Sequence, residues 1–146
     1  MTRLLCLILF LSLSWACATT VPDNGASIDG TWRATEAELG GVEFAEDATE
    51  SIQLVVVAGT YTVTVGDATD KGRIKLDPLM EPKWLEITGT SGPNTGRTIY
   101  AIYEKSGDRM RICYDLSGKA RPGEFRTAKG TKLFLVSYER EEPAER

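Results

Sequence analysis

The chain has 146 residues, of which 42% are hydrophobic, with a formal net charge of −4 and no histidine. This length suffices for one domain with its own core, and the acidic balance argues against the clustered basic face that nucleic-acid binding needs. The lack of histidine excludes Ser-His-Asp and Cys-His catalysis and histidine-ligated metal sites in these residues. We therefore expect a non-catalytic protein without a metal or other cofactor.

Residues 1–16 have the pattern of a cleaved signal peptide. Arg3 supplies a positive start, and residues 4–13 form an apolar run interrupted only by Cys6 and Ser12. Small residues around Cys17 then provide a cleavage point. The apolar run is half as long as the roughly 20 residues that cross a hydrocarbon core. The pattern therefore predicts export with removal of the segment.

Two cleavages compete at the end of this segment. Ala16-Cys17-Ala18 fits a signal peptidase I site that releases the chain at Thr19 into the periplasm. The same residues resemble a bacterial lipobox, from which Ser14 and Trp15 depart. That resemblance implies a lipid on Cys17 and, because no aspartate follows the cysteine, a bacterial outer-membrane location. We expect the lipid anchor, with a soluble periplasmic protein as the alternative.

The remaining chain divides into three parts. Residues 17–27 are polar and contain Pro22 and Asn24-Gly25, a composition typical of a flexible tether. Residues 141–146 form a charged tail. Residues 28–140 are expected to form one globular domain.

Within this domain, apolar and polar residues alternate with the period of a half-buried strand. In residues 60–65, Tyr61, Val63 and Val65 alternate with three threonines. Short Gly- or Asp-containing turns separate most of these runs, but the loop over 117–130 is longer, and 46–51 has room for a helical turn. The predicted strands cover residues 30–39, 51–57, 60–65, 73–76, 83–88, 98–104, 109–116 and 133–138. This pattern predicts an all-β fold, an antiparallel meander barrel of roughly eight strands.

Several motifs in this domain, taken in order, resemble a known kind of domain. They are GTW at 30–32, YTVTV at 61–65, KLDP at 75–78, ITGT at 87–90, GRTIYAIYE at 96–104, ICY at 112–114 and GKARPGEF at 118–125. Together they are similar to the small lipocalin-like domain found in many copies in planctomycete-type bacteria. The resemblance implies fold and export more than activity. It also implies that Trp32 closes the barrel floor against a basic residue from a late strand, a position that Arg140 fits.

An eight-stranded barrel has room for packed side chains or for one small ligand. We therefore expect a domain that binds a small apolar or amphipathic molecule, with Trp32, Tyr103 and Tyr114 lining the interior. The alternative is an envelope protein-protein interaction module whose barrel is filled and holds no ligand.

The loop over residues 117–130 is longer than a hairpin needs, and long loops at barrel ends often carry function. One hypothesis makes it a lid, in which Arg121 pairs with Glu124 while Phe125 plugs the barrel. The other makes Arg121 the anchor for a carboxylate of the ligand. We favour the lid.

Two loop motifs have simpler interpretations than ligand sites. Residues 92–98 resemble a phosphate loop, but three residues separate the glycines and a strand follows, so a glycine-rich hairpin turn is expected. Asp67 and Asp70 offer too few oxygens for Ca²⁺ and are interpreted as turn residues.

Three further side chains are also expected to have structural roles. Glu36 and Glu38, two apart on a strand, are interpreted as exposed carboxylates, because glycosidase-type catalysis needs two carboxyls across a cleft. Cys113 lies in an apolar run and is interpreted as a small buried residue. No catalytic residue and no metal ligand is predicted.

The lipid anchor can be tested directly. Replacing the thiol in Cys17→Ser removes the atom that the lipid is attached to, so metabolic palmitate labelling should be lost in the variant. A wild-type protein that takes up no label would contradict the lipid anchor.

Overall fold

The structure is a computed structural model, which describes residues 27–143. The expected signal peptide, Cys17 and all but the last residue of the expected tether lie outside this range, as do the last three residues of the charged tail. None of the described residues belongs to a helix long and apolar enough to cross a bilayer.

The described part of the chain forms nine strands and one short helix. They are β1 (Gly30–Leu39), β2 (Val42–Glu43), α1 (Glu46–Glu50), β3 (Ile52–Val57), β4 (Thr60–Val65), β5 (Ala68–Asp77), β6 (Lys83–Ser91), β7 (Thr98–Ser106), β8 (Arg109–Asp115) and β9 (Leu133–Arg140). All eight predicted strands and the helical turn are present. β5 begins five residues before its predicted start at residue 73, because its ladder with β4 continues through the polar residues Thr69, Asp70 and Lys71.

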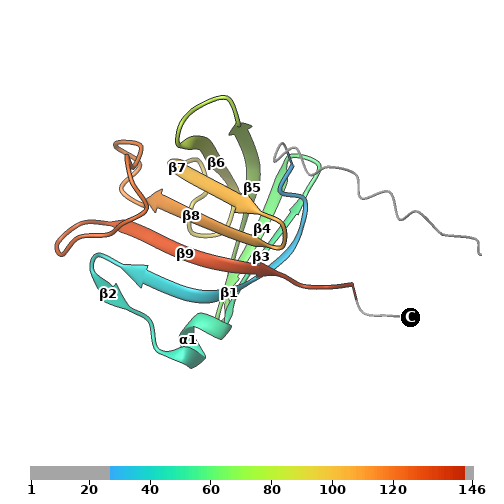
Figure 1. Cartoon of the computed structure of the whole chain (residues 1–146), viewed down its shortest axis with the longest axis horizontal. Helices are drawn as coiled ribbons and strands as arrows, with labels where there is room; N and C mark the ends of the chain where they lie inside the picture. Colours follow the sequence, from blue (N-terminus) through green and yellow to red (C-terminus); the bar gives the residue numbers. More distant parts are fainter. Residues whose placement is uncertain (1–26, 144–146) are drawn as a thin grey trace, which may run out of the picture.

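The strands form one closed antiparallel sheet. From β3 to β9 each strand pairs with the next along the chain, and β1 pairs with both β3 and β9. The β1–β9 ladder runs from Trp32 opposite Arg140 to Leu39 opposite Phe134, and Figure 1 shows these two strands lying side by side. The predicted eight-stranded meander barrel is confirmed, with β2 as a short additional strand beside β1.

The two ends of the barrel differ in how they are filled. The end that carries the start of β1 and the β3–β4 and β7–β8 turns is called the closed end. Large, fully buried side chains fill the interior there, namely Trp32, Leu85, Tyr103, Met110 and Ile112. The opposite end, with the β4–β5 and β6–β7 turns, is called the open end.

Trp32 forms the floor of the closed end. Its indole Nε1 donates a hydrogen bond to the Ile28 carbonyl oxygen at 2.9 Å, and the Arg140 guanidinium lies 4.2 Å from the ring centroid. Arg140 Nη1 also donates to the Asp29 carbonyl oxygen at 2.7 Å. The tryptophan–arginine contact implied by the lipocalin-like resemblance is therefore present, and a cation over an indole face adds to its packing.

Helix α1 covers a gap between β1 and β3. β1 pairs with β3 only from Gly30 to Arg33, and an irregularity between Ala34 and Glu36 shifts its register against β9. α1 packs against β1 and β3 and buries Thr49. The helix thus replaces strand pairing where β1 and β3 part (Figure 1).

Gly72 allows β5 and β6 to approach each other, and its substitution tests the barrel packing. A Cβ at this position would lie 2.1 Å from the Thr88 carbonyl oxygen and 2.7 Å from the Tyr61 ring. Gly72→Ala should therefore lower the free energy of unfolding by about 3 kcal/mol in denaturant titrations.

Gly123→Ala is the matched control, because a Cβ there meets nothing within 4 Å. It should change the free energy of unfolding by no more than about 0.5 kcal/mol. Equal effects of the two substitutions would contradict this account of the packing.

Candidate functional site

The open half of the barrel contains a cavity of about 240 Å³. Its wall is mostly apolar and aromatic, and the side chains come from seven of the eight barrel strands and from the turns at the open end. The lining residues are Leu54, Tyr61, Val63, Val65, Ala68, Asp70, Ile74, Ile87, Pro93, Asn94, Ile99, Tyr114, Leu116, Phe134 and Tyr138. The volume exceeds that of an engineered cavity of about 150 Å³ that binds benzene and falls just below the roughly 300 Å³ of typical ligand pockets.

A polar group centred on Asp70 borders the cavity. Alternation along β5 places Asp70 on the inner face with Gly72 and Ile74, and its side chain is 5% exposed. Tyr61 Oη donates a hydrogen bond to Asp70 Oδ2 at 2.6 Å. The Asn94 backbone N–H donates to Oδ1 at 2.8 Å, and Asn94 Nδ2 donates to Oδ2 at 3.0 Å.

Asn94 belongs to the turn between β6 and β7. Gly92 starts this turn with a φ of +94° and lies so close to β5 that a Cβ would be 2.8 Å from the Asp70 Cα. The predicted glycine-rich turn over residues 92–98 is therefore confirmed for 92–97, with β7 starting at Thr98. The hydrogen bonds to Asp70 fix this turn at the mouth of the cavity.

The tyrosine hydroxyls of the cavity stay neutral. Burial, with the Asp70 hydrogen bond as the next cause, raises the pKa of Tyr61. Burial raises the pKa of Tyr138 to about 12 and that of Tyr114 well above its ordinary value, and the last two share a hydrogen bond. Among the described residues that line the cavity, Asp70 is therefore the one that carries a formal charge.

The three aromatic residues predicted to line the interior all face it, but only Tyr114 borders the cavity. Tyr114 lies 6.1 Å from Phe134, ring centroid to centroid. Trp32 and Tyr103 are fully buried in the packed closed half. No hydrogen-bond partner of the Tyr103 hydroxyl is found among the described residues, and burial, then the charge of Asp77, raises its pKa.

The expected roles of Arg121, Glu124 and Phe125 are wrong, because these side chains lie outside the barrel. Arg121 contacts the outward-facing Glu86 rather than Glu124, and Glu124 pairs with Arg126. The Phe125 ring lies 4.7 Å from the Arg111 guanidinium on the outer face of β8. Phe125 therefore does not plug the interior, and Arg121 has no access to a ligand there.

Arg121 instead holds its loop to the outer wall of β6 and β7. Nη1 donates to the carbonyl oxygens of Leu85 at 2.8 Å and Ala101 at 2.6 Å, and Nη2 donates to Glu86 Oε1 at 2.7 Å. The guanidinium also stacks over the rings of Trp84, at 4.4 Å, and Tyr100, at 5.3 Å. With 15% of the side chain exposed, these contacts are largely shielded from water.

Structural roles were also predicted for two aspartates, two glutamates and a cysteine. Cys113 is fully buried on the outer face of β8, where burial raises the pKa of its thiol to about 11. Asp67 lies in the β4–β5 turn, but the interpretation of Asp70 as a turn residue is wrong, because it sits within β5. Glu36 is exposed and accepts a hydrogen bond from Ser137, whereas Glu38 is half-buried and accepts one from Thr127.

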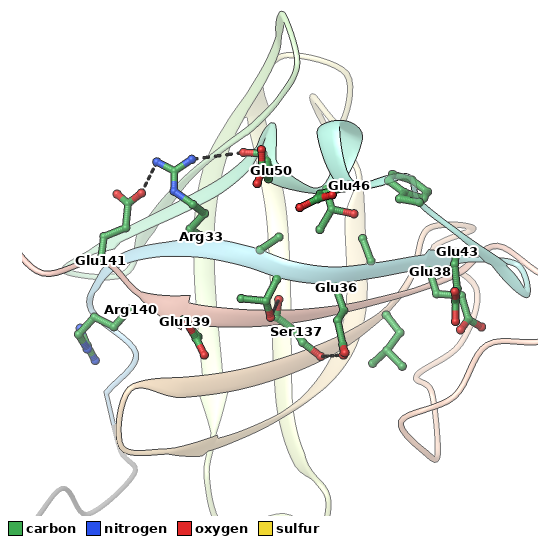
Figure 2. Close-up of a pocket in the computed structure, with 16 residues that line it drawn as sticks. Arg33, Glu36, Glu38, Glu43, Glu46, Glu50, Ser137, Glu139, Arg140 and Glu141 are labelled. Carbon is green, nitrogen blue, oxygen red and sulfur yellow. Dashed lines mark hydrogen bonds and ion pairs between the residues drawn. The ribbon is translucent and has the colours of Figure 1, made fainter.

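A second hollow, an open groove of about 820 Å³, runs along β1 between α1 and β9. Most of its charged side chains are acidic, and Arg33 forms an ion pair with Glu141. Figure 2 shows Glu46 and Glu50 on one side of β1 and Glu36 and Glu139 on the other. The carboxylates therefore do not converge on a point, and no group of metal-binding side chains is found in residues 27–143.

Comparisons with family models, curated proteins and solved structures give no match for this chain. The relation to the planctomycete-type lipocalin-like domain accordingly stays a prediction from the motifs.

The sequence pattern was not used to predict Asp70 as part of the site, although the residues around it contain a signal. Asp70, Gly72, Ile74 and Leu76 follow one another at the period of a strand, which places the aspartate on the face of the apolar residues. An acidic residue on an inward face is unusual enough to mark a site. Nothing in the sequence pairs it with Asn94, which lies 24 residues further on.

The anchoring role of Arg121 can be tested by its effect on stability. Arg121→Ala removes two hydrogen bonds to backbone carbonyls and the contact with Glu86, so the free energy of unfolding should fall by about 2 kcal/mol. Arg109→Ala is the control, because Arg109 forms an ion pair with Glu139 on the surface and is 82% exposed. It should cost less than about 0.5 kcal/mol. A smaller loss for Arg121→Ala than for Arg109→Ala would contradict the anchoring role.

Proposed function

We propose that this domain is a non-catalytic carrier or receptor that binds a small, mostly apolar molecule inside its barrel. The observation that supports the proposal is the uneven filling of the interior. Large side chains occupy the closed half, whereas the open half keeps about 240 Å³ behind walls of valine, isoleucine, leucine and aromatic side chains. A concave, mainly apolar space with few polar groups is the usual form of a small-molecule site.

The size of the cavity limits the ligand. A space of about 240 Å³ suits one aromatic ring with a short chain, since an engineered cavity of about 150 Å³ binds benzene. A sterol or a long acyl chain needs more room than this. Native mass spectrometry of protein purified from its own host would reveal a co-purifying ligand of this size.

We also propose that the domain works outside the cytoplasm, held at the outer membrane by a lipid on Cys17 or, without the lipid, free in the periplasm. The support is the signal-peptide pattern and the lipobox resemblance of the first 17 residues. β1 begins at the closed end of the barrel. A tether from Cys17 would therefore join the domain at the end opposite the cavity mouth.

The ligand site can be tested by filling it. Val63 lines the cavity on β4, so Val63→Phe should occupy part of the space and weaken the binding of propylbenzene, a neutral probe, at least tenfold in calorimetric titrations. Because the added atoms enter space that is already present, the free energy of unfolding should change by less than about 1 kcal/mol.

Val57→Phe provides the matched control. Val57 is 59% exposed and lies at the opposite end of the barrel, so its substitution should leave probe affinity unchanged within twofold. If no apolar or amphipathic probe of this size binds the wild-type protein, or if Val63→Phe binds the probes as well as Val57→Phe does, the proposed function is wrong. A filled interaction module would then be the better account.

A further inference from the structure

The charge of Asp70 is not compensated within the described structure. Asp70 is 5% exposed, and its carboxylate accepts hydrogen bonds from neutral groups, those of Tyr61 and Asn94. None of the ion pairs among residues 27–143 involves it. Removing a carboxylate from water without a cationic partner is costly, so a cation that enters the cavity gains more from this group than it would from an exposed aspartate.

Asp70 also has one hydrogen-bond acceptor position that no described residue occupies. A carboxylate offers about four lone-pair positions, and the contacts with Tyr61 and Asn94 use one on Oδ1 and two on Oδ2. One position therefore remains on Oδ1. An ammonium group, which carries only donors, matches it, whereas a second carboxylate is repelled.

The wall around Asp70 favours an organic cation over an inorganic one. Apart from the Asp70 group, the lining is apolar or aromatic, and it includes the rings of Tyr61, Tyr114, Phe134 and Tyr138. Aromatic faces attract organic cations, and they cannot replace the water shell of a hard metal ion, which requires several oxygen ligands.

We infer that the ligand is a small primary amine with an apolar body, such as one aromatic ring on a short alkyl chain. Its ammonium binds Asp70 at the cavity mouth, and its apolar part extends along Val63, Ile87 and Ile99 into the barrel. This inference rests on the proposed function and names the ligand class for the same cavity.

Three probes of similar size and different charge test the inference on the wild-type protein. They are 2-phenylethylamine, which is cationic at neutral pH, the neutral propylbenzene with the same number of non-hydrogen atoms, and the anionic 3-phenylpropionate. The amine should bind at least tenfold more tightly than propylbenzene in calorimetric titrations, and 3-phenylpropionate should bind most weakly.

A variant then assigns the preference to one side chain. Asp70→Asn removes the charge with little change in volume, so the ratio of amine affinity to propylbenzene affinity should fall at least tenfold. Val63→Phe should weaken both probes, and Val57→Phe neither. If Asp70→Asn does not fold, the comparison of the three probes on the wild-type protein still decides the question.

The outcomes separate this inference from the proposed function. Propylbenzene binding that is sensitive to Val63→Phe, without a preference for the amine, would overturn the amine inference and leave the apolar site in place. Tightest binding of 3-phenylpropionate would overturn the inference as well. Failure of every probe to bind would overturn both proposals.

Discussion

The pairing of β1 with β9 is the contact on which the rest of the structure depends. The six antiparallel pairings from β3 to β9 and the partial β1–β3 ladder would leave an open sheet with two exposed edges. The β1–β9 ladder, from Trp32 opposite Arg140 to Leu39 opposite Phe134, joins these edges. Closure gives every strand one face toward a common interior. Both the packed floor and the cavity exist because of this shared interior.

Within the closed sheet, the size of the inward side chains decides where space remains. Trp32, Tyr103 and Met110 fill the closed half, and Trp32 is further held by Ile28 and by the Arg140 guanidinium. Toward the open end the inward positions of β4 and β5 include Val63, Val65 and Ala68, whose short side chains line the cavity. The same strand pattern thus produces a rigid floor at one end and a cavity at the other. Protein interiors are otherwise closely packed, so this unfilled space is the feature that calls for a function.

The clusters around Arg121 and around Asp70 show that two loops of this barrel have different roles. Arg121 has carbonyl, carboxylate and aromatic partners on the outer wall of β6 and β7, which explains why the long β8–β9 loop stays outside the barrel. The shorter β6–β7 turn is the one that reaches the cavity mouth, through Asn94 and Asp70. The loop with the more conspicuous sequence is therefore structural, and the less conspicuous turn borders the site.

The sequence alone determined the strands, the turns and the barrel, because alternation along a strand is a local property with a period of two residues. It also placed Trp32, Tyr103 and Tyr114 on inward faces and Cys113 in a buried position. Only the tertiary structure decided which inward positions border empty space and which loops lie against the outer wall. The meeting of Asp70 with Tyr61 and Asn94, and that of Arg121 with Glu86, depends on strand register and on side-chain volume summed across the barrel. Neither quantity can be read from the spacing of residues along one chain.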